Sequence, residues 1–139
     1  MLGSLMSGKK PLVSVSRETP VSTIAALLHR HRIGAVLVLD GGAIAGLVSE
    51  RDICAGLHTH GAGILDATAT DIMSAPVVTA TPTTTVVEAM TIMTDRRFRH
   101  LPVVESGQIL GLVSIGDLVK RRIEQAEAEA AAMKDYISS

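Results

Sequence analysis

Aromatic side chains are nearly missing from this chain of 139 residues, which contains one Phe, one Tyr and no Trp. Proteins that bind single-stranded nucleic acid usually stack the bases on aromatic rings, so that means of binding is excluded. Charge of one sign is also lacking, because 13 Lys and Arg stand against 14 Asp and Glu, for a net charge of -1. No overall field is therefore available to attract a polyanion or a membrane surface. We expect neither nucleic acid nor a membrane as a partner.

Cysteine occurs once, at Cys54, which excludes an internal disulfide and a paired-cysteine metal site. We interpret Cys54 as a small buried apolar residue in preference to a reactive thiol. The motifs GxGxxG, GxxxxGK[ST], HExxH and CxxC are missing, and with them the signatures of dinucleotide-binding enzymes, P-loop enzymes and common zinc sites. Two pairs of histidines spaced by two, His29 with His31 and His58 with His60, would suit a metal only in an extended loop. We expect no catalytic residues and no metal site.

Long hydrophobic runs are missing as well. The first ten residues hold no apolar core of signal-peptide length, and no later run approaches the roughly 18 residues that cross a bilayer. Hydrophobic residues nevertheless make up 47% of the chain and charged residues 19%, which is typical of a globular protein with a real core. We expect a soluble, cytoplasmic protein.

The most informative feature that is present is an internal repeat with an offset of 65 residues. Residues 11–57 align with residues 76–122 without a gap. The run GLVS at 46–49 recurs in register, and Asp52 recurs as Asp117. Self-similarity at a fixed offset predicts two copies of one structural unit.

Each copy follows the pattern β-α-β-β-α. Extended segments rich in β-branched and hydroxyl residues come first, at 13–16 and 78–81. A helix follows, for which Thr19 is the expected N-cap and Pro20 the first residue in the first copy. Two apolar runs joined by a short Gly-containing turn then predict a β-hairpin. A second helix ends each copy.

Ser49 and Ser114 are the natural N-caps of these second helices, and Asp52 and Asp117 fall in the first turn. A serine at a helix start lies beside unpaired backbone N–H groups and the positive end of the helix dipole, which together suit an anion. A carboxylate one turn further can accept both hydroxyls of a ribose. The alternative is that Ser and Asp only cap the helix.

The segment between the copies is rich in Gly, Thr and Ala, and leads into a short helical stretch around Asp71 to Met73. After the second copy, apolar residues recur at spacings of 4 and 3, which predicts a helix with a heptad-like stripe. This stripe consists of Val119, Ile123, Ala126, Ala130, Met133 and Ile137. It either covers its own domain or joins two chains.

These features make the chain similar to a tandem pair of cystathionine-β-synthase (CBS) domains, called a Bateman module, of the small standalone bacterial type. The resemblance rests on the repeat and on GLVSERD (46–52), GLVSIGD (111–117), RHLPVV (99–104) and GAVLVLD (34–40). It implies an α/β fold of two β-α-β-β-α repeats related by pseudo-two-fold symmetry, packed through their sheets, with a C-terminal helix. The implied divisions are a first domain (1–60), a linker with a short helix (61–75), a second domain (76–122) and the C-terminal helix (123–139).

The resemblance also implies a ligand: AMP, NAD(H) or ATP, bound as a regulatory rather than catalytic ligand in clefts between the repeats, for energy or redox sensing by a homodimer. The family's Ser/Thr and Asp contact phosphate or ribose, which carries over to Ser114 and Asp117 and to Ser49 and Asp52. The SERD variant of the motif also implies that Arg51 contacts the phosphate, since a guanidinium binds phosphate oxygens bidentately. The walls of one cleft would be Val78, Thr79, Thr81, Phe98, Arg99, His100, Leu101, Pro102 and Ile115, and those of the other Val13, Ser14, Ile33, Gly34, Ala35 and Val36.

The two expected clefts cannot be equivalent, because the second copy reads Ile115 and Gly116 where the first reads Glu50 and Arg51. The alternative function is a structural protein-interaction module with vestigial clefts, whose C-terminal stripe recruits a partner. The identity of any regulated protein stays open.

Overall fold

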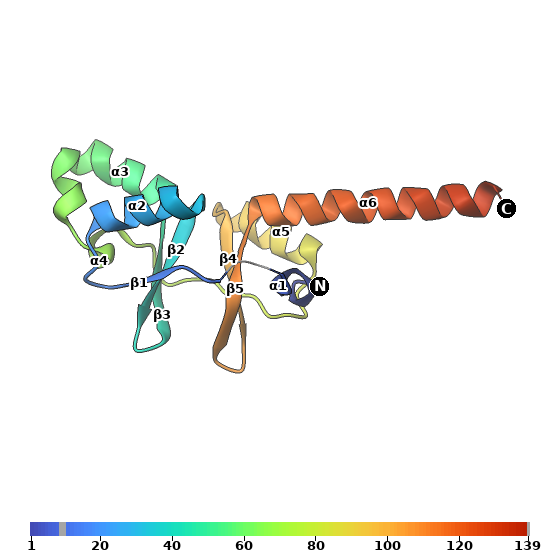
Figure 1. Ribbon diagram of the computed structural model, residues 1–139, viewed down its shortest axis with the longest axis horizontal. Coiled ribbons are helices and arrows are strands. Elements are labelled where there is room, and N and C mark those ends of the chain that lie inside the picture. The colour runs from blue at the N-terminus through green and yellow to red at the C-terminus, as the bar shows by residue number, and fades with distance from the viewer. Residues whose placement is uncertain (9–10, 139) are drawn as a thin grey trace. The chain divides into compact units, whose positions relative to one another are not determined.

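The computed structural model describes residues 1–8 and 11–138, and the chain divides into two compact units (Figure 1). The first-repeat unit spans Leu12–Val77, and the second-repeat unit combines Val78–Ser139 with Met1–Pro11. Each unit thus contains one copy of the repeat, as the offset of 65 residues predicted.

The first-repeat unit has the predicted order β-α-β-β-α. Its elements are β1 (Ser14–Ser16), α2 (Val21–His31), β2 (Ala35–Asp40), β3 (Ala43–Ser49) and α3 (Glu50–His60), followed by the 3-10 helix η1 (Gly61–Asp66) and by α4 (Ala69–Ile72). The sheet has the order β1-β2-β3, with β1 parallel to β2 and β2 antiparallel to β3. Alternate residues of β2 and β3 pack with the apolar stripe of α2 into one core, which includes Val36, Val38, Val48, Val21, Ile24 and Leu28.

The second-repeat unit contains α1 (Gly3–Met6), α5 (Val86–Arg96), β4 (His100–Glu105), β5 (Gln108–Ser114) and α6 (Ile115–Ser138). The antiparallel pair β4-β5 repeats the register of β2-β3. The strand expected at 78–81 is reduced to a single parallel bridge between Ala80 and Val103. The position that is Leu37 in the first copy is Pro102 here, and proline has no N–H with which to extend the ladder.

Residues 1–8 pack on the second repeat, although they precede the first in sequence. The N–H of Leu2 donates to the carbonyl of Thr84 (2.8 Å), and the N–H of Gly3 donates to the carbonyl of Pro82 (2.9 Å). Leu2 is fully buried in the core of this unit. The expected first domain at 1–60 therefore has its opening segment in the other unit.

The start of helix α2 differs from the predicted one. Helix α2 begins at Val21 with Pro20 as its N-cap, so the assignment of the cap to Thr19 was wrong. The Thr19 hydroxyl instead accepts the N–H of Ser16 (3.1 Å) and lies 3.1 Å from the Ser16 hydroxyl. It therefore stabilises the turn between β1 and α2.

The interpretation of Cys54 as a buried residue was also wrong, because its side chain is exposed. Helix α3 turns Ile53 and Gly56 inward, which points Cys54 away from the core. The same helix continues to His60, so His58 and His60 lie on a helix and not in an extended loop. Residues two apart on a helix point in different directions, and within residues 1–8 and 11–138 no three His, Cys, Asp or Glu residues are grouped so that they could hold a metal ion.

Helix α6 is one continuous helix of 24 residues. It joins the second helix of the repeat to the C-terminal helix expected at 123–139 without a break as far as Ser138, and position 139 of that prediction lies outside the described residues. Among the described helices, none has both the length and the apolar character needed to cross a membrane.

Candidate ligand-binding site

In each unit, the start of a strand lies beside the start of a helix. In the first-repeat unit Ala35 pairs with Ser49, and the N–H of Glu50 donates to the carbonyl of Gly34 (3.0 Å). The second-repeat unit repeats this arrangement with residues 65 positions later: His100 pairs with Ser114, and the N–H of Ile115 donates to the carbonyl of Arg99 (2.9 Å). The fold thus gathers residues that the sequence placed in separate motifs.

The start of α3 is held by a complete capping box. The Asp52 Oδ2 atom accepts the N–H of Ser49 (2.8 Å) and its hydroxyl (3.0 Å), while the Ser49 hydroxyl accepts the N–H of Asp52 (3.3 Å). The Asp52 Oδ1 atom accepts the hydroxyl of Ser74 (3.1 Å). Both carboxylate oxygens of Asp52 are therefore engaged within the protein.

The start of α6 has two of the same hydrogen bonds. The Asp117 Oδ2 atom accepts the N–H of Ser114 (2.8 Å), and the Ser114 hydroxyl accepts the N–H of Asp117 (3.2 Å). Both residues are half-buried. Between them, Gly116 is exposed, and a Cβ added there would meet the Ser114 hydroxyl at 3.6 Å, which is ordinary contact. The surface over the first turn of α6 is thus open to an approaching group.

This arrangement can hold an anion. The first turn of a helix presents backbone N–H groups and the positive end of the helix dipole, and α6 is long enough for that dipole to be fully developed. A serine hydroxyl that accepts one hydrogen bond still carries a proton to donate. Arg99, at the adjacent strand start, is exposed and supplies a positive charge.

The structure separates the expected wall residues by burial. The buried ones, which present no side-chain surface to a ligand, are Leu101, Pro102, Ala35 and Val36. The half-buried ones are Val13, Val78, Ile33, Gly34, Phe98, His100 and Ile115. The exposed ones are Ser14, Arg51, Thr79, Thr81 and Arg99. The buried residues could contact a ligand only through their main-chain groups.

Thr81 is not brought to the helix start. Its neighbour Ala80 pairs with Val103, three positions along β4 from His100. At about 3.3 Å per strand residue, this places Thr81 roughly 10 Å or more from the Ser114 end of the sheet. The Thr81 hydroxyl lies 2.9 Å from the hydroxyl of Thr83, and the Thr81 N–H donates to the Thr84 hydroxyl (3.2 Å). These contacts stabilise the turn before α5.

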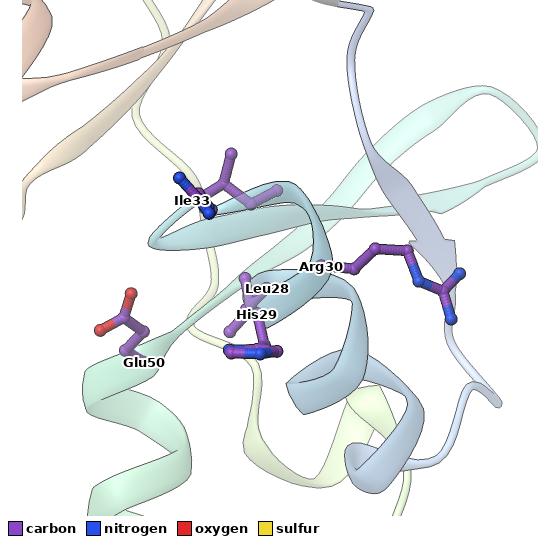
Figure 2. A pocket seen from close by; sticks show the side chains of 6 residues that line it. Leu28, His29, Arg30, Ile33 and Glu50 are labelled. Atoms are coloured by element: carbon purple, nitrogen blue, oxygen red, sulfur yellow. The ribbon is translucent and has the colours of Figure 1, made fainter.

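An open pocket of about 530 Å³ lies beside the start of α3. Its lining comprises Leu28, His29, Arg30, Arg32, Ile33 and Glu50, and Figure 2 shows Ile33 and Glu50 on one side while the Arg30 side chain points away from them. Of these residues only Ile33 was expected at a binding site. Leu28, His29, Arg30 and Arg32 come from the end of α2 and Glu50 from the start of α3, and no pattern in the sequence indicates that these two helix ends meet.

The CBS domain family model matches residues 3–59 and again residues 69–124. The chain belongs to the CBS domain family. The two matches correspond to the two repeats, so the protein contains a pair of CBS domains, with the α/β fold that the motifs predicted.

Relatives with names and structures support this assignment. A mitochondrial CBS domain-containing protein of Arabidopsis thaliana is 35% identical over 115 residues, which cover 79% of this chain and 56% of that protein. The chain therefore spans little more than half of that relative. A CBS-domain-containing protein of Agrobacterium tumefaciens has a structure that matches 87% of this chain and 98% of its own, with a TM-score of 0.84 and 36% identity. A third, from Pyrobaculum aerophilum and complexed with AMP, has a TM-score of 0.73 and 28% identity over 83% of this chain and 88% of its own.

Proposed function

We propose that this CBS pair is a regulatory module that binds an adenine nucleotide, AMP or NAD(H) before ATP, and that Ser114 and Asp117 contact the ligand. One observation carries the proposal: the Ser114–Asp117 pair lies half-buried at the open start of a 24-residue helix, beside Arg99 and His100. The AMP complex of the Pyrobaculum aerophilum relative supports the choice of ligand class.

In this proposal each part of the nucleotide has a matching group. The phosphate lies over the first turn of α6, where N–H groups and the helix dipole favour an anion. The Asp117 carboxylate accepts hydrogen bonds from the ribose hydroxyls. The half-buried side chains of Phe98 and Ile115 contact the adenine, whose flat apolar faces need little else.

We propose that the corresponding position in the first repeat binds the same class of ligand more weakly. Glu50, which replaces Ile115, adds a negative charge near the phosphate position. Arg51 offsets part of this repulsion as the proposed phosphate partner.

The second candidate is a protein-interaction module whose ligand positions are vestigial. The engagement of both Asp52 oxygens within the protein favours it for the first repeat, because such a carboxylate needs no ligand. Under this candidate a thermal-shift screen with AMP, ATP and NADH is flat. Under either candidate the protein regulates or assembles and does not catalyse a reaction, and we propose a homodimer as the assembly.

Isothermal titration calorimetry with AMP, ATP and NADH tests the proposal. We expect Asp117→Ala to weaken the bound nucleotide by about 1.5 to 3 kcal/mol, the usual contribution of hydrogen bonds to a charged group. Asp52→Ala is the matched change in the first repeat and leaves the tighter binding event in place. Circular dichroism verifies that each variant is folded. The proposal fails if none of the three nucleotides binds below millimolar concentration, or if Asp117→Ala binds as well as the wild type.

A further inference from the structure

The apolar stripe of α6 is exposed. Ile123 is 54% exposed, Met133 63% and Ile137 77%, and every residue from 126 to 138 belongs to the exposed class. The stripe therefore does not cover its own domain, which was one of its two expected roles. Large aliphatic side chains repeated along one face of a helix lose favourable burial when they remain in water.

Only the first part of α6 is anchored to its unit. Leu118 is fully buried, and the Arg121 guanidinium donates to the hydroxyl of Ser4 (3.0 Å). Beyond this point the helix continues past α5 and α1 (Figure 1). The extension from Ile123 to Ser138 is about 24 Å long at 1.5 Å per residue. In proteins most helical stability comes from the packing of an apolar face and not from intrinsic propensity, so burial against a partner would stabilise the extension.

The stripe has the spacing of a coiled-coil seam. Its six residues alternate between steps of 4 and 3, which assigns Val119, Ala126 and Met133 to d positions and Ile123, Ala130 and Ile137 to a positions of a heptad. The flanking e positions are then Lys120, Glu127 and Lys134, and the charged g positions are Arg122 and Glu129. Charges at e and g determine which helix pairs with which, and in which direction.

These flanking charges fit a second copy of the same helix in parallel orientation. In a parallel pair in register, each g residue lies next to the residue five positions later on the other helix. Arg122 then meets Glu127 of the partner subunit, and Glu129 meets Lys134 of the partner subunit. Both contacts join opposite charges, and the two-fold symmetry repeats each of them.

The opposite orientation fits poorly. An antiparallel pair that aligns all six stripe residues brings e next to e and g next to g. Glu127 and Glu129 would then each face their own counterpart, and Lys120 would face Lys134 of the partner subunit. All of these contacts join like charges. Antiparallel pairs shifted by one heptad avoid them only by leaving two of the six stripe residues without a layer.

We propose that α6 pairs with α6 of a second copy as a parallel, in-register, two-stranded coiled coil over residues 119–137. Ile123 and Ile137 lie against their own counterparts in this arrangement, and the small side chains of Ala126 and Ala130 let the helices approach closely at the centre. The assembly needs no nucleotide, so it stands or falls separately from the proposed ligand binding.

Disulfide trapping tests the orientation. Ile123→Cys is combined with Cys54→Ser, so that the new thiol stands alone, and the full-length protein is oxidised without nucleotide. We expect a cross-linked dimer, because the two thiols face each other across one layer. In the antiparallel pair they would be about 15 Å apart along the axis, beyond the reach of a disulfide. The matched control is Ala128→Cys, on the opposite face of the helix. No cross-link at position 123, or equal cross-linking at 128, overturns the proposal.

Sedimentation equilibrium on charge variants tests the partner contacts. Glu129→Lys replaces two attractive contacts per dimer by two repulsive ones, which we expect to raise the dimer dissociation constant roughly ten-fold. Adding Lys134→Glu restores opposite charges and the affinity. The positions are exposed, so the fold is unaffected. The proposal that a second copy occupies this face is contradicted by a chain that stays monomeric at about 100 micromolar. It is also contradicted by a dimer whose dissociation constant does not change with Glu129→Lys.

Discussion

At the scale of single residues, the same Ser–Asp pair holds a helix start in both repeats. In both copies the aspartate accepts the backbone N–H of the serine three residues earlier, which holds the helix start. In the first repeat the aspartate also accepts the hydroxyls of Ser49 and Ser74. We therefore assign Asp52 a structural role. The proposal that Asp117 contacts the ligand rests on its position in the first turn of α6, where Gly116 is exposed and the start of β4 lies alongside.

The structural role of Asp52 gives a stability prediction. Asp52→Ala removes its hydrogen bonds to Ser49 and Ser74, and we expect it to lower the free energy of unfolding by about 2 kcal/mol. Ser74→Ala removes one of these bonds and leaves the capping box, so its cost is about 1 kcal/mol or less. Urea denaturation followed by circular dichroism measures both. Equal costs for the two variants would mean that the capping box contributes little.

Gly46 gives a packing prediction. A Cβ at this position would lie 2.5 Å from the sulfur and 2.8 Å from the Cγ of Met73, both too close for unstrained packing. We expect Gly46→Ala to destabilise the protein by about 1 to 3 kcal/mol. The variant that also carries Met73→Ala removes the clashing atoms, so its two changes should cost less together than their separate costs added. Additive costs in urea denaturation would show that the close approach is not the cause.

Some residue roles were accessible from the sequence and some were not. The caps Ser49 and Ser114 were correctly predicted because a cap is a local signal: a hydroxyl, a carboxylate three residues later and an apolar run. The contact of Ser74 with Asp52 spans 22 residues, and no local pattern encodes it. The burial of Cys54 was predicted wrongly because composition gives a residue's usual environment, while the face of α3 on which it lies determines the actual one.

At the scale of elements, the two copies build the same helix with different caps. Helix α5 is capped by Thr85, whose hydroxyl accepts the N–H of Glu88 (3.1 Å) and donates to its carboxylate (3.1 Å). Helix α2 has Pro20 at this position and no side-chain cap hydrogen bond. The start of α5 therefore depends on one side chain, and that of α2 does not.

We expect Thr85→Ala to lower the free energy of unfolding by about 1 kcal/mol, the usual cost of removing a threonine cap. Thr94→Ala, in the last turn of the same helix, is the matched control. Its hydroxyl donates to the carbonyl of Met90 (2.8 Å), a bond that adds little to helix stability, so its effect should stay within about 0.5 kcal/mol. Thermal unfolding of both variants measures the two effects. Similar melting temperatures for Thr85→Ala and Thr94→Ala would refute the importance of the cap.

The predicted hairpins were correct, and the geometry of their turns explains why the sequence indicated them. Both have two-residue loops, since Asp40 pairs with Ala43 and Glu105 with Gln108. The loop residues Gly41, Gly42, Ser106 and Gly107 all have positive φ, which matches the turn type that glycine favours. The strand at 78–81 was predicted too long, because β-propensity does not register the missing N–H of Pro102 on the neighbouring strand.

At the scale of the whole molecule, the repeat was the decisive signal, because two copies of one pattern predict two copies of one unit. The packing of residues 1–8 on the second repeat was not predictable. It depends on Leu2 and on hydrogen bonds to residues about 80 positions later, and a single apolar residue near a terminus carries no periodic signal. The pocket beside α3 was missed for the same reason, since the meeting of two helix ends is a property of the fold.

We propose that the helix starts of the repeats bind an adenine nucleotide, and titration of the ¹⁵N-labelled protein with AMP detects such binding residue by residue. We predict saturable shifts of the backbone amides at Ser114 to Asp117 and of their neighbours at Arg99 and His100. Smaller shifts, at higher AMP concentration, are expected at Ser49 to Asp52. The hairpin turns at 41–42 and 106–107, at the other end of the strands, should stay unchanged. A spectrum that does not change with millimolar AMP, or shifts confined to those turns, would refute nucleotide binding at the helix starts.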